Sequence, residues 1–397
     1  MSEEPKTPDP SLLLDLMTRV ERRFDAVKER LADRFDRDDR VQILPYRGYG
    51  TRERLWLQGR VLEDEPVGTA GKKDSVWRNL GNTWKRFETD ELPGIRVEAR
   101  VGGWTGEMVT DEEGYFRFDV NLPEPLAASL PEDGRLWHEV ELELPESPVR
   151  ACGEVLVPPA GARFGVISDI DDTVVETGVT RRLAMARTVL LRNAHTRLPF
   201  AGVAAFYAAL HEARESRGPN PLFFVSASPW NLYDLLAEFM GLHGIPRGPI
   251  LLRDLGLDRR RLLKVPTAEH KLGCIRPILE TYPELPFILI GDSGEQDPEI
   301  YREVVREHPG RILAVYIRAI RARGDSPDRA ARVEALAGEM RREGVPMLLV
   351  PDTEAAAVHA AEHGWIDPGR LPGVREEKVK DEIAPSPTEA ALEIGPA

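Results

Sequence analysis

The sequence predicts an α/β protein in which a doubly wound parallel sheet is preceded by a small β-sandwich domain and an N-terminal helix. Two hydrophobic patterns support this fold class. Apolar and polar residues alternate from about Val41 to Pro158, whereas from Phe164 onward short apolar runs are separated by helical stretches. A chain of 397 residues is long enough for two sizeable cores. We therefore expect two domains, over residues 41–158 and 159–372.

Composition narrows the class of protein. The chain is 42% hydrophobic and 30% charged, which is ordinary for a soluble globular protein, and its net charge is −14. This acidic balance argues against nucleic acid as a partner, because a nucleic-acid binder needs a broad basic surface. No apolar run approaches the length of a membrane span, and the start MSEEPKTPDP resembles neither a secretory signal nor a transit peptide. Cys152 and Cys274, the two cysteines, suit a reducing compartment, so we expect a cytoplasmic protein.

Residues 1–40 are expected to form a disordered start and one amphipathic helix. Over Ser11–Arg37 apolar residues recur at spacings of three and four, with acidic and basic residues between them. A helix bound to a membrane surface usually has a clearly basic polar face. The mixed sign of the charges here therefore favours docking on this protein, or pairing with a second copy, over membrane binding.

Four stretches of the next segment alternate as half-buried strands do. They are residues 54–61, 95–101, 115–120 and 137–144. The sequence DEEG at 111–114 supplies a turn between two of them. This pattern predicts a β-sandwich, and GEMVTDEEGYFRFDV resembles the hairpin of transthyretin-like modules. We expect this domain to be structural or to recruit a partner.

The second domain is expected to place its chemistry at one edge of a parallel sheet. Its apolar runs are residues 164–168, 222–226, 287–291, 312–317 and 347–350. Helical stretches separate the runs, as in a sheet covered on both faces. Such sheets bind ligands beyond the carboxyl ends of their strands, so the polar residues that follow each run are candidate site residues. Residues 373–397, rich in Glu, Pro and Ala, are expected to be a disordered tail.

Acidic residues cluster at the end of the first of these strands. Asp169, Asp171 and Asp172 would repel one another, and a divalent cation among them would neutralise their charge. The structural alternative is that aspartate closes a turn and caps the next helix, which explains one such residue well and three poorly. The pattern therefore predicts a metal site.

Four further polar residues follow in a fixed order along the domain. They are Ser226 and Asp292 at strand ends, Lys271 before a helix, and Asp297 at a helix start. Each alone has an ordinary structural explanation, such as helix capping by Asp297. Together with DIDDT at 169–173 they resemble the four motifs of the haloacid-dehalogenase superfamily, over about residues 164–317. The resemblance implies a doubly wound, Rossmann-like fold of the haloacid-dehalogenase type.

The same resemblance implies a magnesium-dependent phosphatase with an aspartyl-phosphate intermediate. Asp169 is then the nucleophile and Asp171 the general acid and base, an acid that phosphatases have and haloacid dehalogenases lack. Ser226 and Lys271 hold the phosphoryl oxygens, and Thr173 orients the loop around the substrate. The implied Mg²⁺ ligands are Asp169, Asp171 through its main-chain carbonyl, Asp292 and Asp297.

A narrower resemblance concerns the substrate. The stretches FGVISDIDDTVVETG, FFVSASPWNLYDLL and ILIGDSGEQDPEIY are similar to the actin-patch phosphatidate phosphatase family and its bacterial relatives. This resemblance implies hydrolysis of phosphatidate, or a related lipid phosphate, with peripheral contact to a membrane. Within the second stretch, Trp230 is expected to be a core residue.

The residues themselves leave the phosphate ester open. Between Glu176 and Glu212 there is no acidic residue, and the basic residues there are Arg181, Arg182, Arg187, Arg192 and Arg197. Such a segment suits a lipid head group, but also a packed helix with solvated arginines or a soluble phosphoester. Arg253, near a strand end, is a further candidate substrate contact. A phosphatase for a soluble phosphomonoester and a non-catalytic membrane or partner-binding module remain alternatives, and the oligomeric state is open.

Overall fold

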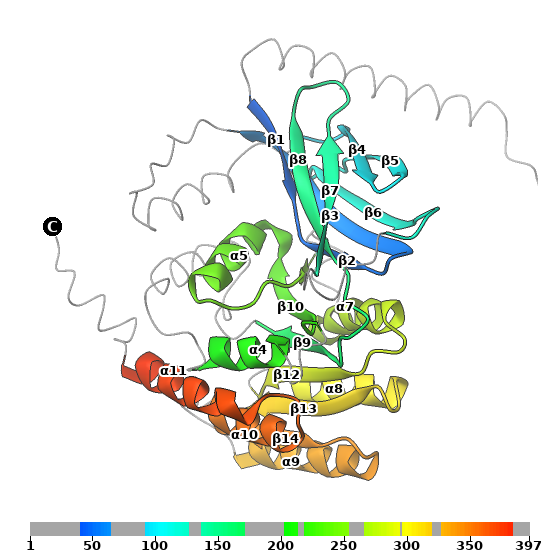
Figure 1. The fold of residues 1–397 in the computed structure, drawn as a ribbon. Coiled ribbons are helices and arrows are strands. Elements are labelled where there is room, and N and C mark those ends of the chain that lie inside the picture. Colours follow the sequence, from blue (N-terminus) through cyan, green and yellow to red (C-terminus); the bar gives the residue numbers. More distant parts are fainter. Residues whose placement is uncertain are drawn as a thin grey trace, which may run out of the picture.

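The structure is a computed structural model, and it describes only part of the chain. The described residues are 40–64, 92–126, 136–170, 202–212, 218–253, 266–293, 296–319 and 327–383. The predicted N-terminal helix, Asp171, Asp172, Thr173 and the five-arginine segment lie outside these residues. The described strands form two sheets that lie one above the other in Figure 1. This arrangement confirms a mixed α/β protein with a β-rich part before the parallel sheet.

The first sheet comes from the N-terminal part of the chain. Its strands are β1 (Arg40–Pro45), β2 (Gly48–Gly50), β3 (Arg54–Asp64), β4 (Arg96–Val101), β5 (Trp104–Val109), β6 (Tyr115–Asn121), β7 (Trp137–Glu143) and β8 (Arg150–Leu156). Their order is β1-β3-β2-β8-β7-β4-β5, and β6 also pairs with β3. Neighbouring strands are antiparallel except for β2 and β8, which are parallel.

This sheet encloses its own core. The alternating pattern of the sequence buries one face of strands such as β4, and buried side chains of the core include Leu55, Val97, Phe118 and Val140. Hydrogen bonds connect these strands into one continuous sheet, because short β2 pairs with both β3 and β8. Gly48 permits that close approach, since a Cβ there would lie 2.1 Å from the Trp56 carbonyl oxygen.

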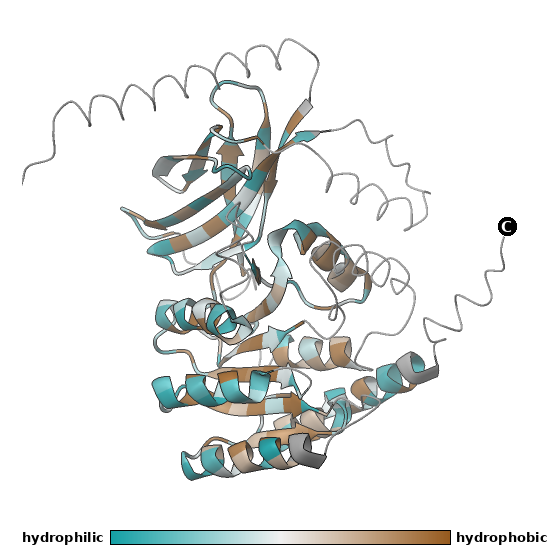
Figure 2. Ribbon diagram, turned by 180° about the vertical axis from the view of Figure 1, so that it is seen from behind, coloured by the Kyte–Doolittle hydropathy of each residue, from teal (hydrophilic) through white to brown (hydrophobic). Residues whose placement is uncertain are grey.

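The second sheet is parallel throughout and is covered by helices on both faces. Its strands are β9 (Gly165–Asp169), β10 (Leu222–Pro229), β11 (Ile250–Arg253), β12 (Phe287–Asp292), β13 (Ile312–Arg318) and β14 (Met347–Val350), in the order β11-β10-β9-β12-β13-β14. Each predicted apolar run forms one of these strands. Brown, apolar residues fill the strands in Figure 2, as expected for a sheet buried on both sides.

Two groups of helices cover this sheet. The helices are α4 (Val203–Glu212), α5 (Tyr233–Leu242), α7 (Thr267–Thr281), α8 (Asp297–Glu307), α9 (Pro327–Arg342), α10 (Thr353–Glu362) and α11 (Leu371–Ile383), with 3-10 turns η1 (Trp230–Leu232) and η2 (Pro368–Arg370). One apolar cluster contains side chains of α4, α5, α10 and α11. The other contains side chains of α7, α8 and α9. Within the described part of the chain, no helix is long and apolar enough to cross a membrane.

The prediction of a disordered tail from residue 373 was wrong for residues 373–383. These residues belong to α11, which packs against α4 and α10 and contributes fully buried Val374 to the apolar cluster. Lys378 Nζ lies 2.6 Å from Asp352 Oδ2, and Glu377 Oε2 accepts a hydrogen bond from the Ala205 amide. Composition did not reveal this docking because one apolar residue and a few charges contribute little to a hydropathy pattern.

The two sheets are joined by aromatic and hydrogen-bonded contacts. The ring of Tyr46, which follows β1, stacks on Trp230 of η1 with centroids 5.1 Å apart and planes 8° apart. The Tyr115 hydroxyl donates to Asn231 Oδ1 at 2.6 Å. The Tyr282 hydroxyl, after α7, donates to the Gly50 carbonyl at 3.0 Å and accepts from the Gly50 amide at 3.1 Å. Trp230 is buried as predicted, and part of its packing comes from the first sheet.

Candidate active site

The carboxyl ends of three adjacent strands bring the candidate site residues together. Asp169 is the last residue of β9, Asp292 is the last residue of β12, and Ser226 lies in β10. Strand β9 is hydrogen-bonded to both β10 and β12, so their ends meet at one edge of the sheet. The prediction placed Ser226 at the end of its strand, whereas β10 continues to Pro229.

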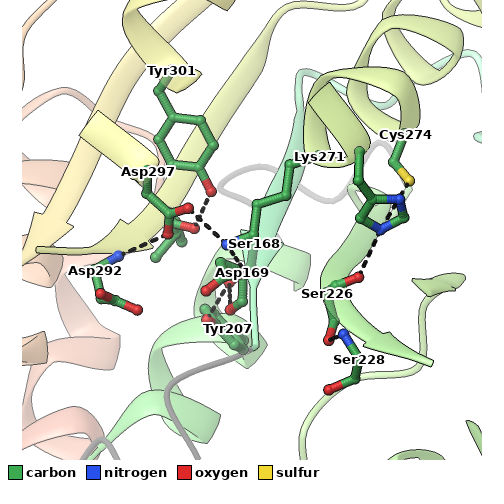
Figure 3. Close-up of polar contacts among 12 residues, drawn as sticks. Ser168, Asp169, Tyr207, Ser226, Ser228, Lys271, Cys274, Asp292, Asp297 and Tyr301 are labelled. Atoms are coloured by element: carbon green, nitrogen blue, oxygen red, sulfur yellow. Dashed lines mark hydrogen bonds and ion pairs between the residues drawn. The ribbon is translucent and has the colours of Figure 1, made fainter. Parts of the chain in front are cut away.

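Lys271 is the centre of a buried charged cluster. It lies in the first turns of α7, and its side chain is 1% exposed. Its Nζ is 2.7 Å from Asp169 Oδ1 and 2.8 Å from Asp297 Oδ1 (Figure 3). One ammonium therefore holds two carboxylates that come from β9 and α8. The sequence predicted Lys271 as a site residue, and the structure brings it directly against Asp169.

Asp297 is enclosed by main chain as well as by Lys271. Its Oδ2 accepts a hydrogen bond from the Asp292 amide at 3.1 Å. A Cβ on Gly291 would lie 2.4 Å from that same oxygen, so only glycine leaves room for the carboxylate there. Burial raises the pKa of Asp297 to about 6; Lys271 acts to lower this pKa, and the charge of Asp292 acts to raise it.

The cluster has the donor set of a hard-cation site. Each of Asp169, Asp292 and Asp297 offers a carboxylate oxygen, and these atoms lie within 4.8 Å of one another. Lys271 supplies one positive charge against three buried carboxylates. The negative charge that is left over can be neutralised by a divalent cation. Carboxylate oxygens are the ligands that Mg²⁺ prefers, so these residues fit the predicted ion.

Two residues that sequence reasoning missed support the nucleophile candidate. The Tyr207 hydroxyl of α4 and Ser168 Oγ are 2.6 Å apart, and Ser168 Oγ donates to the Asp169 carbonyl at 3.0 Å. Burial raises the pKa of Tyr207 to about 12, which keeps its hydroxyl protonated at neutral pH. These contacts hold the main chain at the end of β9. Tyr207 gave no signal in the sequence because it lies on an apolar helix face.

Ser226 lies beside the charged cluster on the neighbouring strand (Figure 3). Its side chain is buried, and its Oγ accepts a hydrogen bond from the Ser228 amide at 2.9 Å. A ring nitrogen of His270, the residue before Lys271, is 2.9 Å from the Ser226 carbonyl oxygen. Arg253 ends β11, on the far side of β10 from Asp169, and is half-buried.

The fold and the site together define an α/β protein with a metal-type aspartate cluster at the carboxyl edge of a parallel sheet. Residues 164–319 match the family model of the phosphatidate phosphatase APP1 catalytic domain. This stretch therefore carries the pattern of the actin-patch phosphatidate phosphatase family, and the narrower of the two resemblances seen in the sequence is confirmed.

Relatives in two yeasts are similar to part of the chain. Phosphatidate phosphatase APP1 of Saccharomyces cerevisiae is 37% identical over 163 residues, which are 41% of this chain and 26% of that protein. An uncharacterized protein of Schizosaccharomyces pombe is 31% identical over 159 residues, or 40% of this chain and 25% of that protein. This chain thus spans about a quarter of the length of these relatives.

Similarity to solved structures is weak. A carbohydrate acetylesterase from Xanthomonas citri aligns with a TM-score of 0.32 and 13% identity, over 80% of this chain and 72% of that chain. A score at this level supports no statement about fold or function.

Proposed function

We propose that this chain is a Mg²⁺-dependent phosphatase, with a haloacid-dehalogenase-like catalytic domain, that hydrolyses phosphatidate or a related lipid phosphate through an aspartyl-phosphate. The observation that carries this proposal is the buried contact of Asp169 with Lys271 inside a stretch that matches a phosphatase family. A purely structural ion pair would not need two further carboxylates beside it, because buried like charges destabilise the folded protein.

In the proposed reaction, Asp169 uses a carboxylate oxygen to attack phosphorus. The phosphorus–oxygen bond of the ester breaks, and the leaving oxygen takes a proton from Asp171. Asp171 then removes a proton from water, whose oxygen attacks the phosphorus of the aspartyl-phosphate and releases inorganic phosphate. Lys271, 2.7 Å from Asp169 Oδ1, holds that carboxylate in place and offers positive charge to the phosphoryl oxygens.

Further residues bind and orient the phosphoryl group in this proposal. Ser226 and Thr173 donate hydrogen bonds to it or order the loop around it, and Arg253 contacts the rest of the ester. Asp169, the Asp171 carbonyl, Asp292 and Asp297 would hold Mg²⁺. A bound Mg²⁺ supplies charge neutralisation for the phosphoryl oxygens.

The lipid part of the proposal comes from the named relative. The similar yeast protein bears the name phosphatidate phosphatase, and the residues that match the family model of the same name include the stretch around Ser226. Phosphatidate lies in a membrane, so the proposed enzyme works at a lipid surface as a peripheral protein.

A substrate panel tests the proposed function. Phosphate release from phosphatidate vesicles is compared with release from soluble sugar and nucleotide phosphates, with and without Mg²⁺. We expect phosphatidate to be preferred and the activity to need Mg²⁺. A preference for a soluble ester would contradict the lipid substrate and leave the phosphatase chemistry standing.

Asp169→Asn tests the nucleophile. We expect turnover to fall by at least roughly a thousandfold while the circular dichroism spectrum is kept, because an amide cannot form the covalent intermediate. Acid-quenched wild-type protein should carry phosphate on the peptide that contains Asp169. Asp367→Asn is the matched control, since Asp367 only caps η2 by accepting from the Gly369 amide, and it should leave turnover unchanged.

Metal binding has a readout that is independent of turnover. Mg²⁺ should raise the unfolding temperature of the wild-type protein, because a ligand that binds the folded state stabilises it. Asp292→Asn should remove most of this shift. An equal shift in the variant would mean that the ion binds elsewhere.

A further inference from the structure

A second pocket lies between the two sheets, away from the aspartate cluster. Its volume is about 440 Å³, in the range of sites that bind small molecules. One wall is the outer face of β3 and β6, and the other is formed by β11 and one face of α7. Asp169, Asp292 and Asp297 do not line it. The pocket therefore does not belong to the candidate active site.

The wall from the first sheet presents two polar side chains side by side. Gln58 of β3 and Arg117 of β6 are directly opposite in the strand register, so their side chains share a face. Gln58 is only 8% exposed. Neither side chain has a hydrogen bond or ion pair to another described residue. A buried amide beside a guanidinium supplies N–H donors to an anion such as a carboxylate, phosphate or sulfonate.

The other charged groups of the pocket do not compete for that anion. Arg54 and Asp119 form a two-pronged ion pair with each other, with distances of 3.0 and 3.1 Å. Glu280 lines the pocket from the last turns of α7, on the wall opposite β6 and Arg117. The net positive end of the pocket is thus at Arg117.

Next to the polar pair the pocket is aromatic and apolar. Trp56 is two residues from Gln58 on β3 and on the same face, and its ring lies 6.4 Å from that of Trp230 with planes 34° apart. Leu251 and Leu252 of β11 add apolar surface. Trp230 is buried, whereas the ring of Trp56 is half-buried and can contact a flat apolar group.

We propose that this pocket binds a small anionic molecule with a flat apolar part. The anionic group is held by Gln58 and Arg117, and the apolar part lies against Trp56 and Trp230. Binding in this position also touches His270, which lines the pocket and contacts the Ser226 carbonyl. Any effect of the ligand on turnover rests on the proposed phosphatase function, whereas binding itself does not.

A pair of fluorescent probes tests both halves of the proposal on the full-length protein. One is 8-anilinonaphthalene-1-sulfonate, a flat apolar anion, and the other is N-phenyl-1-naphthylamine, which has the same rings without the sulfonate. The sulfonate probe should bind at one saturable site and quench tryptophan fluorescence. Arg117→Gln should weaken the sulfonate probe about tenfold and leave the neutral probe unchanged, because a charge-assisted hydrogen bond is lost.

Filling the pocket provides the second variant. Gly273 lines the pocket from the middle of α7, and a Cβ there would meet no atom within 4 Å. Gly273→Leu should keep the fold, because leucine favours a helix more than glycine does, and should weaken both probes at least about tenfold. Gly338→Leu in α9 is the matched control: it too has no atom within 4 Å of its Cβ, but it lies outside the pocket.

The outcomes separate clearly. Unchanged binding of the sulfonate probe to Gly273→Leu would overturn the site, and equal loss with Gly338→Leu would show that the effect is not local. If Gly273→Leu weakens binding of the sulfonate probe and Arg117→Gln does not, the proposal that the ligand is an anion would be overturned. Because no turnover is measured, these results do not depend on whether the chain is a phosphatase.

Discussion

The aspartate cluster and the junction between the sheets are both buried, but different interactions stabilise them. In the cluster the ammonium of Lys271 contacts Asp169 and Asp297, and the carboxylate of Asp292 lies near these two acids, so the three carboxylates outnumber the lysine charge. The junction uses neutral groups: stacked rings such as Tyr46 and Trp230, and hydroxyls such as that of Tyr282. Buried charge is costly and contributes little net stability, whereas paired neutral groups and rings stabilise. The difference fits the proposed role of the cluster in catalysis and a structural role for the junction.

Removing the central ammonium is the change that should affect stability most. In Lys271→Met, Asp169 and Asp297 are left buried without their cation, so we expect the free energy of unfolding to fall by about 3–5 kcal/mol without metal. Urea denaturation measures this loss. Mg²⁺ should restore part of it, because a cation among the carboxylates replaces the missing charge.

A surface lysine is the control for that variant. Lys378 also contacts two acids, Asp352 and Glu354, but both acids are partly exposed. Lys378→Met should therefore cost less than about 1 kcal/mol. Equal losses for the two lysine variants would contradict the view that the site charges are held out of water.

The junction should respond to the loss of one hydroxyl. In Tyr282→Phe, both the amide and the carbonyl of Gly50 lose their buried partner, so we expect a loss of about 1–3 kcal/mol. Hydrogen exchange at Gly50 should become faster, while exchange in β12 should not change. Tyr316→Phe is the control, because its hydroxyl contacts only the His359 ring within the α/β part. If hydrogen exchange at Gly50 is as slow in Tyr282→Phe as in the wild-type protein, the hydroxyl of Tyr282 does not stabilise β2.

The sequence was informative where function requires a rare pattern. Asp169, Lys271, Asp292 and Asp297 were all predicted as site residues. Most of them have an ordinary structural explanation when taken singly, but their combination in this order at strand ends and helix starts is hard to explain by structure alone. The five apolar runs predicted five of the six described strands of the parallel sheet, all except β11, since strands buried on both faces need continuous hydrophobic sequence. These features are local, so each is visible in a short window.

Long-range contacts were not visible in the sequence. Tyr207 contacts Ser168 across 39 positions, and Tyr282 contacts Gly50 across 232 positions, and nothing near either tyrosine marks its partner. The alternation of β3 and β6 predicted two faces but not that the face with Trp56, Gln58 and Arg117 is turned toward another sheet. Docking of α11 likewise depends on partners far away in sequence.

The smallest expected effect concerns α11, where the prediction of disorder failed. Asp352 caps α10 by accepting from the Ala355 amide at 3.0 Å, and it also pairs with Lys378 of α11. Asn keeps a capping oxygen and loses the charge, so Asp352→Asn should cost about 0.5 kcal/mol at pH 7 by urea denaturation.

The pH dependence of that loss identifies its cause. Burial acts to raise the pKa of Asp352, but hydrogen bonds from Lys378 and the Ala355 amide outweigh it and hold the pKa below its usual value. A lowered pKa in the folded state contributes stability above the unfolded pKa of about 3.9, and this contribution is lost as the pH falls through the folded value. The difference between wild type and Asp352→Asn should therefore be full at pH 7 and vanish toward about pH 2. If the difference in the free energy of unfolding persists in acid, it comes from the capping of α10 by Asp352. The docking of α11 would then depend on Val374 rather than on the ion pair with Lys378.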